Sequence, residues 1–505
     1  MSPSPDSPNP NPEGHRAPSF LASLTPVLFM IALLASSVIL FGEDASYGPN
    51  QVALMLSAGL AGIIGIRHGY QWDDIEDGIV ASISVAMPAA LILLAVGALI
   101  GSWILAGTVP YMIVLGATLL SPDWFYPATC LICALVSLSI GSSWTTAGTL
   151  GVALMGSAQA MDMSPAMTAG AVISGAYFGD KMSPLSDTTN LAAAVSRVNL
   201  FDHIRNLLWT ALPALALALV VFAVLGRTDA VADVGLFEAL ERELGREFDL
   251  SVFTLIPLAL LLYLSIRRYP PLPVIGFGAL AGVATALILQ YDAAVARAPA
   301  GFEGLTAALA GAWRALFDGY ATASDVPQMA ALLDRGGMSS MLNTIWLILC
   351  AMTFGGVMER TGLLQRLVAD LLRLARGTAS LQITTLGTAL TTNVLASDQY
   401  MSVALPGRLY EQAYAERGLH PLNLSRGLED GGTLTSVLIP WNTCGAYMAA
   451  TLGVATFTYL PWALFNLFSL GFSVLWAVLG VGLVRTPRDD AAPSPHPDEQ
   501  EAFRS

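Results

Sequence analysis

The sequence is poor in charge, lysine, histidine and cysteine. Its 505 residues are only 12% charged, about half of the roughly 25% found in an average soluble domain. Hydrophobic residues make up 54% of the chain and the mean hydropathy is +0.62. This apolar, weakly charged composition excludes an ordinary soluble enzyme, a disordered chain, a collagen-like chain and a disulfide scaffold. The net charge of −14 argues against nucleic acid as a partner, because phosphate binding needs a basic surface.

The four cysteines and five histidines provide few candidate metal ligands. Cys130 and Cys133 form a C-x-x-C within an apolar segment, where cysteine usually packs as a small hydrophobe. We therefore expect neither a disulfide nor a metal site there. The histidines are scattered, and neither H-E-x-x-H nor G-x-S-x-G occurs. A membrane-embedded enzyme is consequently improbable, and we expect no cofactor.

Lysine occurs once, as Lys181, against 22 arginines. It lies in the polar stretch GAYFGDKMSPLSDTTNLAAA (175–194), between long apolar runs. Inserting an ionisable side chain at membrane depth costs at least ~2.5–3.5 kcal/mol of free energy. We therefore expect this stretch to have a function, unless it is a water-exposed loop. A lysine where the chain otherwise uses arginine indicates a need for a compact ammonium with an adjustable pKa.

Apolar runs recur from residue 19 to 484, and a bilayer crossing takes about 20 residues. We predict an all-α polytopic membrane protein of the cell (plasma or inner) membrane, with 10–13 transmembrane helices, some of them broken. The predicted organisation is a disordered tail (1–18), a first transmembrane repeat (19–226), a connector with amphipathic segments and two spans (227–340), a second transmembrane repeat (341–484) and a disordered tail (485–505). Arginines near the ends of the runs favour cytoplasmic termini.

Four clusters of small oxygen-bearing side chains interrupt these runs, at 141–151, 175–194, 390–400 and 427–445. Glycine, proline and such residues unwind a membrane helix where it lines a cavity. At an offset of 250 residues, chemically similar residues coincide in four pairs: Ser142 with Thr392, Asp180 with Asp430, Ser183 with Thr433, and Ser186 with Ser436. Unless these four matches are a coincidence, they predict two repeats in the chain, and we expect the repeats to be inverted. Their broken helices or hairpins would meet at the midplane, as in a secondary transporter.

Sodium is a hard cation that prefers oxygen ligands, and a carboxylate binds either Na⁺ or a proton. We predict Asp187 and Asp180 as the exchanging, Na⁺-binding carboxylates and Lys181 as their counter-charge. The other predicted ligands or helix caps are Ser142, Ser143, Thr145, Ser183, Ser186, Thr188, Thr189, Asn190, Thr392, Asn393, Asp398, Glu429, Asp430, Thr433, Ser436, Asn442 and Thr443. A channel remains an alternative, although paired helix breaks with buried carboxylates fit alternating access better.

Three segments closely resemble the NhaC-type sodium/proton antiporters: SGAYFGDKMSPLSDTTNLA (174–192), GSSWTTAGTLGVALMG (141–156) and LEDGGTLTSVLIPWNTC (428–444). GSWILAGTVP (101–110) and FGGVMERTGLL (354–364) are similar to the same family. The resemblance implies an ion-transporter-superfamily fold with inverted repeats, and exchange of cytoplasmic Na⁺ for external H⁺.

Some members of this family resemble carriers of organic ions. A Na⁺- or H⁺-coupled exchanger or symporter of a small organic anion (lactate or malate) or of an amino acid is therefore the alternative function. The partners implied are the lipid bilayer, Na⁺ and H⁺, and a homodimer is left open.

Overall fold

The computed structural model describes residues 16–486, except 43, 44, 46, 227–233, 323 and 325. Within these residues all regular secondary structure is helical, and extended backbone pairs only in one isolated bridge, between Leu419 and Arg485. The prediction of an all-α protein is confirmed. Most of the two predicted tails, residues 1–15 and 487–505, lies outside the described residues.

The first part of the chain forms the helices that surround the first two polar clusters. These are α1 (Phe20–Phe41), α2 (Pro49–Arg67), α3 (Trp72–Leu105), α4 (Thr108–Leu119), α5 (Phe125–Ile140), α6 (Ser143–Thr146), the π-helical turn η3 (Ala147–Gly151), α7 (Val152–Ala160), α8 (Pro165–Met182), α9 (Asp187–Val195) and α10 (Leu200–Leu225).

The connector and the last part of the chain follow. The connector contains α11 (Val234–Glu247), α12 (Ile256–Ile266), α13 (Pro271–Leu289), α14 (Tyr291–Ala296), α15 (Gly304–Asp318) and α16 (Pro327–Leu333). The last part contains α17 (Leu342–Arg360), α18 (Leu363–Leu372), α19 (Thr378–Ala396), α20 (Gln399–Glu416), α21 (Pro421–Leu428), the π-helical turn η6 (Glu429–Thr433), α22 (Leu434–Ser436), α23 (Thr443–Leu452), α24 (Thr456–Tyr459) and α25 (Leu464–Leu479).

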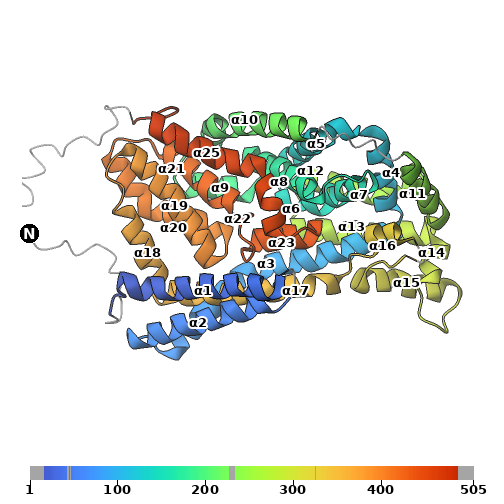
Figure 1. Cartoon of the computed structure of the whole chain (residues 1–505), viewed down its shortest axis with the longest axis horizontal. Helices are drawn as coiled ribbons and strands as arrows, with labels where there is room; N and C mark the ends of the chain where they lie inside the picture. Colours follow the sequence, from blue (N-terminus) through green and yellow to red (C-terminus); the bar gives the residue numbers. More distant parts are fainter. Residues whose placement is uncertain are drawn as a thin grey trace, which may run out of the picture.

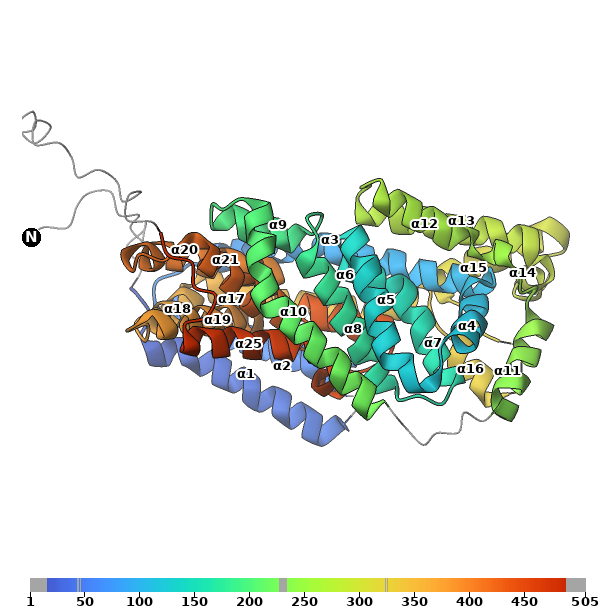
Figure 2. The same cartoon turned by 90° about the horizontal axis from the view of Figure 1, so that it is seen from above.

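Helices from both ends of the sequence share one elongated body (Figures 1 and 2). In Figure 1, α1, α2, α3 and α17 run along one long side, and α17 packs against both α2 and α3. The short and broken helices α5–α9 and α19–α25 lie on the other side of α3 (Figure 1). The polar clusters are thus held against a layer of long helices.

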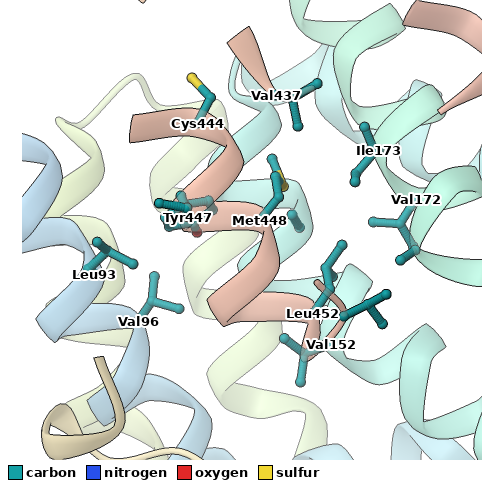
Figure 3. Close-up of a cluster of buried hydrophobic side chains, with 14 of the residues drawn as sticks. Leu93, Val96, Val152, Val172, Ile173, Val437, Cys444, Tyr447, Met448 and Leu452 are labelled. Carbon is teal, nitrogen blue, oxygen red and sulfur yellow. The ribbon is translucent and has the colours of Figure 1, made fainter. Parts of the chain in front are cut away.

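The core is continuous between these layers (Figure 3). Met448 and Leu452 of α23 lie between Val96 of α3 and Val172 of α8, and all four side chains are buried. Because α23 belongs to the second half and α8 to the first, this cluster joins the two halves next to the polar clusters.

Small residues allow α5 and α8 to approach closely. A Cβ atom on Gly175 would lie 2.0 Å from the Cys130 carbonyl oxygen and 2.9 Å from the Cys133 Cβ. Close contact through small residues is the usual way in which membrane helices pack. Cys130 and Cys133 are themselves fully buried, as expected for packing residues.

Seven helices in the described part of the chain are long and apolar enough to cross a membrane, or up to nine if each of two bent pairs counts as one span. The bends are 83° at the α11–α12 break and 60° at the α24–α25 break. The predicted 10–13 spans are not reached by this criterion. Polar residues explain the difference: α8 carries Asp180 and Lys181, and α19 carries threonines along with Gln382 and Asn393.

The connector was predicted to contain amphipathic segments and two spans. Helices α11 and α15 lie where the two amphipathic segments were expected. Residues 227–233, at the start of the first predicted segment, lie outside the described residues. α15 packs through alanine and glycine onto α3 and α14. A Cβ on Gly311 would lie 1.9 Å from the Ala294 carbonyl oxygen, so α15 is bound closely to the helical body.

Candidate functional site

Each polar cluster breaks a helix, and each break has its own start signal. In the first half, α5 ends at Gly141 (φ +76°), and the Ser142 hydroxyl accepts the Thr145 N–H at 3.2 Å to begin α6. A Cβ on Gly141 would lie 2.5 Å from the Leu185 Cβ, so both the left-handed backbone and the available space require glycine. α8 ends at Met182, and the Ser186 hydroxyl begins α9.

The second half has the same pair of breaks. Between α19 and α20, Ser397 is left-handed (φ +59°) and the Asp398 carboxylate accepts the Met401 N–H at 2.8 Å. Between α22 and α23, the Asn442 side-chain oxygen accepts the Cys444 N–H at 3.1 Å. Short polar side chains that take up the free N–H groups are the usual N-caps of helices.

The two caps of each half have the same spacing along the sequence. Ser142 and Ser186 are 44 residues apart (186 − 142), as are Asp398 and Asn442 (442 − 398), so corresponding caps differ by 256 residues. The predicted offset was 250. That register pairs the Ser142 cap with Thr392, which lies inside α19 and donates its hydroxyl to the Thr388 carbonyl. The inversion of the two halves stays a prediction.

All four breaks meet at one cavity of about 290 Å³. The polar or charged residues that line it are Ser142, Ser143, Thr145, Asp180, Ser186, Asp187, Thr188, Asp398, Gln399, Tyr400 and Thr443, together with Gly141 and Trp144. Its apolar wall consists of Pro271 and Val85, Ala86, Pro88, Ala89 and Ile92 of α3. We call this cavity the four-break pocket.

Three carboxylates line the four-break pocket at different depths. Asp180 is 8% exposed, and its Oδ2 accepts the Ser143 hydroxyl at 2.6 Å and the Ser143 N–H at 3.1 Å. Asp398 is 2% exposed, whereas Asp187 is exposed at the first residue of α9. Asp187 and Asp398 lie at helix N-termini, where the helix dipole favours negative charge.

No lysine, arginine or histidine is among the described residues that line this pocket. Across the described part of the chain, no group of three His, Cys, Asp or Glu side chains is arranged to hold a metal ion. The pocket is therefore an acidic cavity whose carboxylates are distributed over its wall.

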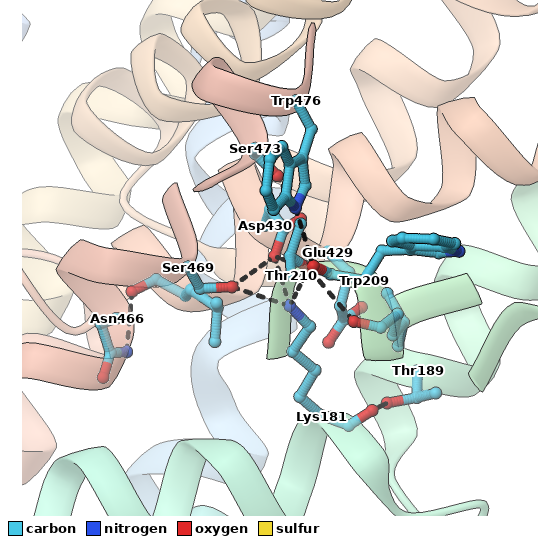
Figure 4. Close-up of polar contacts among 12 residues, drawn as sticks. Lys181, Thr189, Trp209, Thr210, Glu429, Asp430, Asn466, Ser469, Ser473 and Trp476 are labelled. Atoms are coloured by element: carbon cyan, nitrogen blue, oxygen red, sulfur yellow. Dashed lines mark hydrogen bonds and ion pairs between the residues drawn. The ribbon is translucent and has the colours of Figure 1, made fainter. Parts of the chain in front are cut away.

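Lys181 lies in a second, sealed polar centre (Figure 4). Its ammonium forms an ion pair with Asp430, and both side chains are fully buried. Lys181 also donates to Thr210 Oγ1 at 3.1 Å and to Ser469 Oγ at 2.9 Å. Asp430 additionally accepts hydrogen bonds from the hydroxyls of Thr210, Ser469 and Ser473. Lys181 is thus the partner of Asp430 rather than a side chain of the four-break pocket.

Glu429 is a fully buried residue whose one hydrogen bond links it to the pocket wall. Its Oε1 accepts the Thr188 hydroxyl at 3.2 Å, while its Oε2 has no hydrogen-bond partner in the structure. Thr188 also shares a hydrogen bond with Ser186 at 3.1 Å.

Several residues predicted as ligands or helix caps hold the helix breaks together. Asn393 Nδ2 donates to the Gly432 carbonyl at 2.5 Å, and Asn442 Nδ2 donates to Asn393 Oδ1 at 3.0 Å. Asn190 Nδ2 donates to the Ser186 carbonyl at 2.7 Å. The predicted residues absent from the pocket lining are Lys181, Ser183, Thr189, Asn190, Thr392, Asn393, Glu429, Asp430, Thr433, Ser436 and Asn442.

The sequence prediction missed the larger side chains and the apolar wall of the lining. Trp144, Gln399 and Tyr400 lie in the polar clusters but were not selected, because sodium ligation alone favours small oxygen-bearing side chains. The α3 wall was also missed, although Pro88 lies within an otherwise regular apolar run and a proline inside a helix is a detectable signal. His203, near the start of α10, is fully buried, and its Nδ1 lies 2.8 Å from Ser425 Oγ.

Comparison with known proteins identifies the family. A family model described as the Na⁺/H⁺ antiporter family matches residues 175–481. An uncharacterized Na⁺/H⁺ antiporter of Haemophilus influenzae is 38% identical over 473 residues, covering 93% of this chain and 98% of that protein. The Na⁺/H⁺ antiporter NhaC of Alkalihalophilus pseudofirmus is 37% identical over 455 residues, covering 90% and 94%.

Related proteins also include a carrier with organic substrates. The malate-2H⁺/Na⁺-lactate antiporter of Bacillus subtilis is 36% identical over 435 residues, covering 86% of this chain and 90% of that protein. Among solved structures, Neisseria gonorrhoeae MtrF aligns over 92% of this chain and 96% of its own at 12% identity, with a TM-score of 0.35. On the family match and the relatives above 30% identity, this chain belongs to the Na⁺/H⁺ antiporter family.

Proposed function

We propose that this chain exchanges cytoplasmic Na⁺ for external H⁺ by alternating access, and that the four-break pocket is the ion site. The observation that carries the proposal is the convergence of all four helix breaks, with three carboxylates, on one cavity. Broken helices in paired halves are typical of secondary transporters.

The pocket offers the ligands that sodium prefers. Carboxylates from Asp180, Asp187 and Asp398 and hydroxyls from the same wall supply oxygen atoms, which suit a hard cation. Asp180 is the central candidate because it is buried and held by two Ser143 donors. A carboxyl that binds a proton no longer binds Na⁺, so alternate occupancy by the two ions gives exchange.

The position of the pocket along α3 supports alternating access. α3 has 34 residues, about 51 Å at 1.5 Å per residue, and its pocket residues 85–92 lie around its midpoint. If α3 crosses the bilayer, the pocket lies near the membrane centre. An ion there has comparable distances to travel to either side, as a carrier requires.

The organisation of the chain is part of the proposal. Residues 19–226 and 341–484 form two transmembrane repeats, 227–340 connects them, and 1–18 and 485–505 are tails in the cytoplasm. The protein lies in the cell membrane, as a monomer or a homodimer, and crosslinking in membranes distinguishes these two states.

A small organic anion fits the pocket less well than Na⁺. A carboxylate substrate would enter a cavity that three carboxylates line, without lysine, arginine or histidine among the described lining residues. Like charges in a medium of low dielectric constant repel strongly. The observed lining therefore favours a cation as the substrate.

Everted membrane vesicles containing the protein test the proposal. Addition of Na⁺ is expected to dissipate an imposed pH gradient. Asp180→Asn, Asp187→Asn and Asp398→Asn are each expected to lower the exchange rate at least tenfold, which corresponds to about 1.4 kcal/mol. Asp123→Asn, at an exposed residue between α4 and α5, is the matched control. A folded Asp180→Asn variant that exchanges at the wild-type rate contradicts the assignment.

A further inference from the structure

Two features of the four-break pocket exceed what sodium requires. Sodium is held by oxygen atoms, yet one wall is formed by aliphatic and proline side chains of α3 and by Pro271. The cavity of about 290 Å³ is also large, because a water molecule takes up about 30 Å³ in the liquid. The volume corresponds to roughly ten water molecules and admits an organic molecule of several non-hydrogen atoms.

The pocket also contains aromatic rings beside its carboxylates. Tyr400 lines the same cavity as Asp180, Asp187 and Asp398. Trp144 lines the same cavity and stacks on Tyr447, with ring centroids 4.1 Å apart and planes inclined by 11°. The Tyr447 hydroxyl donates to the Trp144 carbonyl at 2.8 Å, which fixes this aromatic wall in place.

This combination matches the chemistry of an organic ammonium ion. The positive head of such an ion is attracted both to carboxylates and to the face of an aromatic ring, and its alkyl part gains from burial against an apolar wall. A carboxylate on the ligand would find no lysine, arginine or histidine among the described lining residues. We propose that the four-break pocket also binds a small organic ammonium ion that carries no carboxylate, in competition with Na⁺. This goes beyond Na⁺/H⁺ exchange but uses the same pocket.

Binding to the purified protein in detergent tests the inference. A pH-gradient assay is unsuitable because a neutral amine crosses lipid and dissipates the gradient by itself. The probes are n-propylammonium and tetramethylammonium, and the readout is displacement of bound radioactive Na⁺. Both probes are expected to displace Na⁺, with affinity rising up to about fourfold for each methylene from methyl- to n-propylammonium.

Variants distinguish specific binding of an organic ammonium ion from nonspecific displacement of Na⁺ by added salt. Tyr400→Leu is expected to lower the ratio of ammonium affinity to Na⁺ affinity about fivefold, whereas Tyr400→Phe keeps the ring and the ratio. Tyr263→Leu, at an exposed tyrosine of α12 outside the pocket lining, is the matched control. The wild-type chain-length series tests the inference even where the Leu variant does not fold.

The outcomes distinguish this inference from the proposed function. Failure of both probes to displace Na⁺ from a protein that binds it overturns the inference, as does an affinity that does not change with alkyl length. An unchanged affinity ratio in a folded Tyr400→Leu variant overturns it too. Absence of Na⁺-driven proton movement in wild-type vesicles instead refutes Na⁺/H⁺ exchange, and displacement by ammonium is measured independently of that result.

Discussion

Replacing Lys181 with methionine leaves Asp430 without its ion-pair partner in a fully buried site. Methionine keeps most of the length of the lysine side chain, so the change removes the charge with little loss of volume. Asp430 retains hydroxyl donors from Thr210, Ser469 and Ser473, but hydroxyl groups do not neutralise a carboxylate. The variant therefore isolates the energetic role of the ammonium.

The expected cost follows from the burial of both partners. Removing one member of a buried ion pair typically destabilises a protein by about 3–5 kcal/mol, because the other charge remains uncompensated. Lys181 and Asp430 are both 0% exposed, so the upper part of this range applies. Lys181→Met combined with Asp430→Asn is expected to cost less than the sum of the single changes by at least about 2 kcal/mol, since neither charge is left alone.

The measurement is equilibrium unfolding of the purified protein in mixed micelles, with each variant compared to the wild type. Arg197→Met is the control, because the Arg197–Glu411 pair has a 3.2 Å separation but side chains that are 79% and 40% exposed. Exposed pairs contribute about 0–1 kcal/mol. The reasoning is refuted if Lys181→Met costs no more than Arg197→Met, or if the double variant loses the full sum of the two single changes.

Two further predictions concern packing and the connector. Gly175→Ala would place a Cβ 2.0 Å from the Cys130 carbonyl oxygen and is expected to lower the free energy of unfolding by about 1–3 kcal/mol. The control is Gly276→Ala on α13, where nothing lies within 4 Å, and this variant should differ little from the wild type in thermal unfolding. Tyr320→Phe removes the 2.8 Å hydrogen bond to the Glu247 carboxylate but keeps the ring under Arg297, so a loss of about 1.5–3 kcal/mol is expected. Tyr320→Leu should lose more, and equal losses in the two variants would exclude a contribution from the ring.

The helix breaks that line the four-break pocket could be predicted from sequence because their signals are local. Glycine, serine and asparagine at a helix break have the same role in any tertiary context: they permit a left-handed residue or cap the free N–H groups. Gly141, Ser142, Ser186 and Asp398 all lie in the predicted clusters and all mark breaks. The clusters at 141–151, 175–194, 390–400 and 427–445 each contribute to the pocket lining.

The pairing of the two halves could not be obtained in the same way. Matching Asp180 to Asp430 compares two carboxylates with different surroundings, since one lines the pocket and the other is paired with Lys181. The breaks themselves repeat at 256 residues. Side-chain chemistry alone does not reveal which residue caps a helix and which lies inside one, so matching residues by chemistry gave an offset of 250.

Adjacent residues on α8 explain why the counter-charge could not be assigned from sequence. Asp180 and Lys181 are neighbours in the chain, which suggests an ion pair, but successive residues of a helix do not face each other. Asp180 turns toward the pocket, and Lys181 turns toward α10, α25 and Asp430. The last turn of α8 therefore belongs to both polar centres. Movement of this turn during transport would either preserve the Lys181–Asp430 pair or require the free energy to separate it. The pair therefore restricts how α8 can move relative to η6.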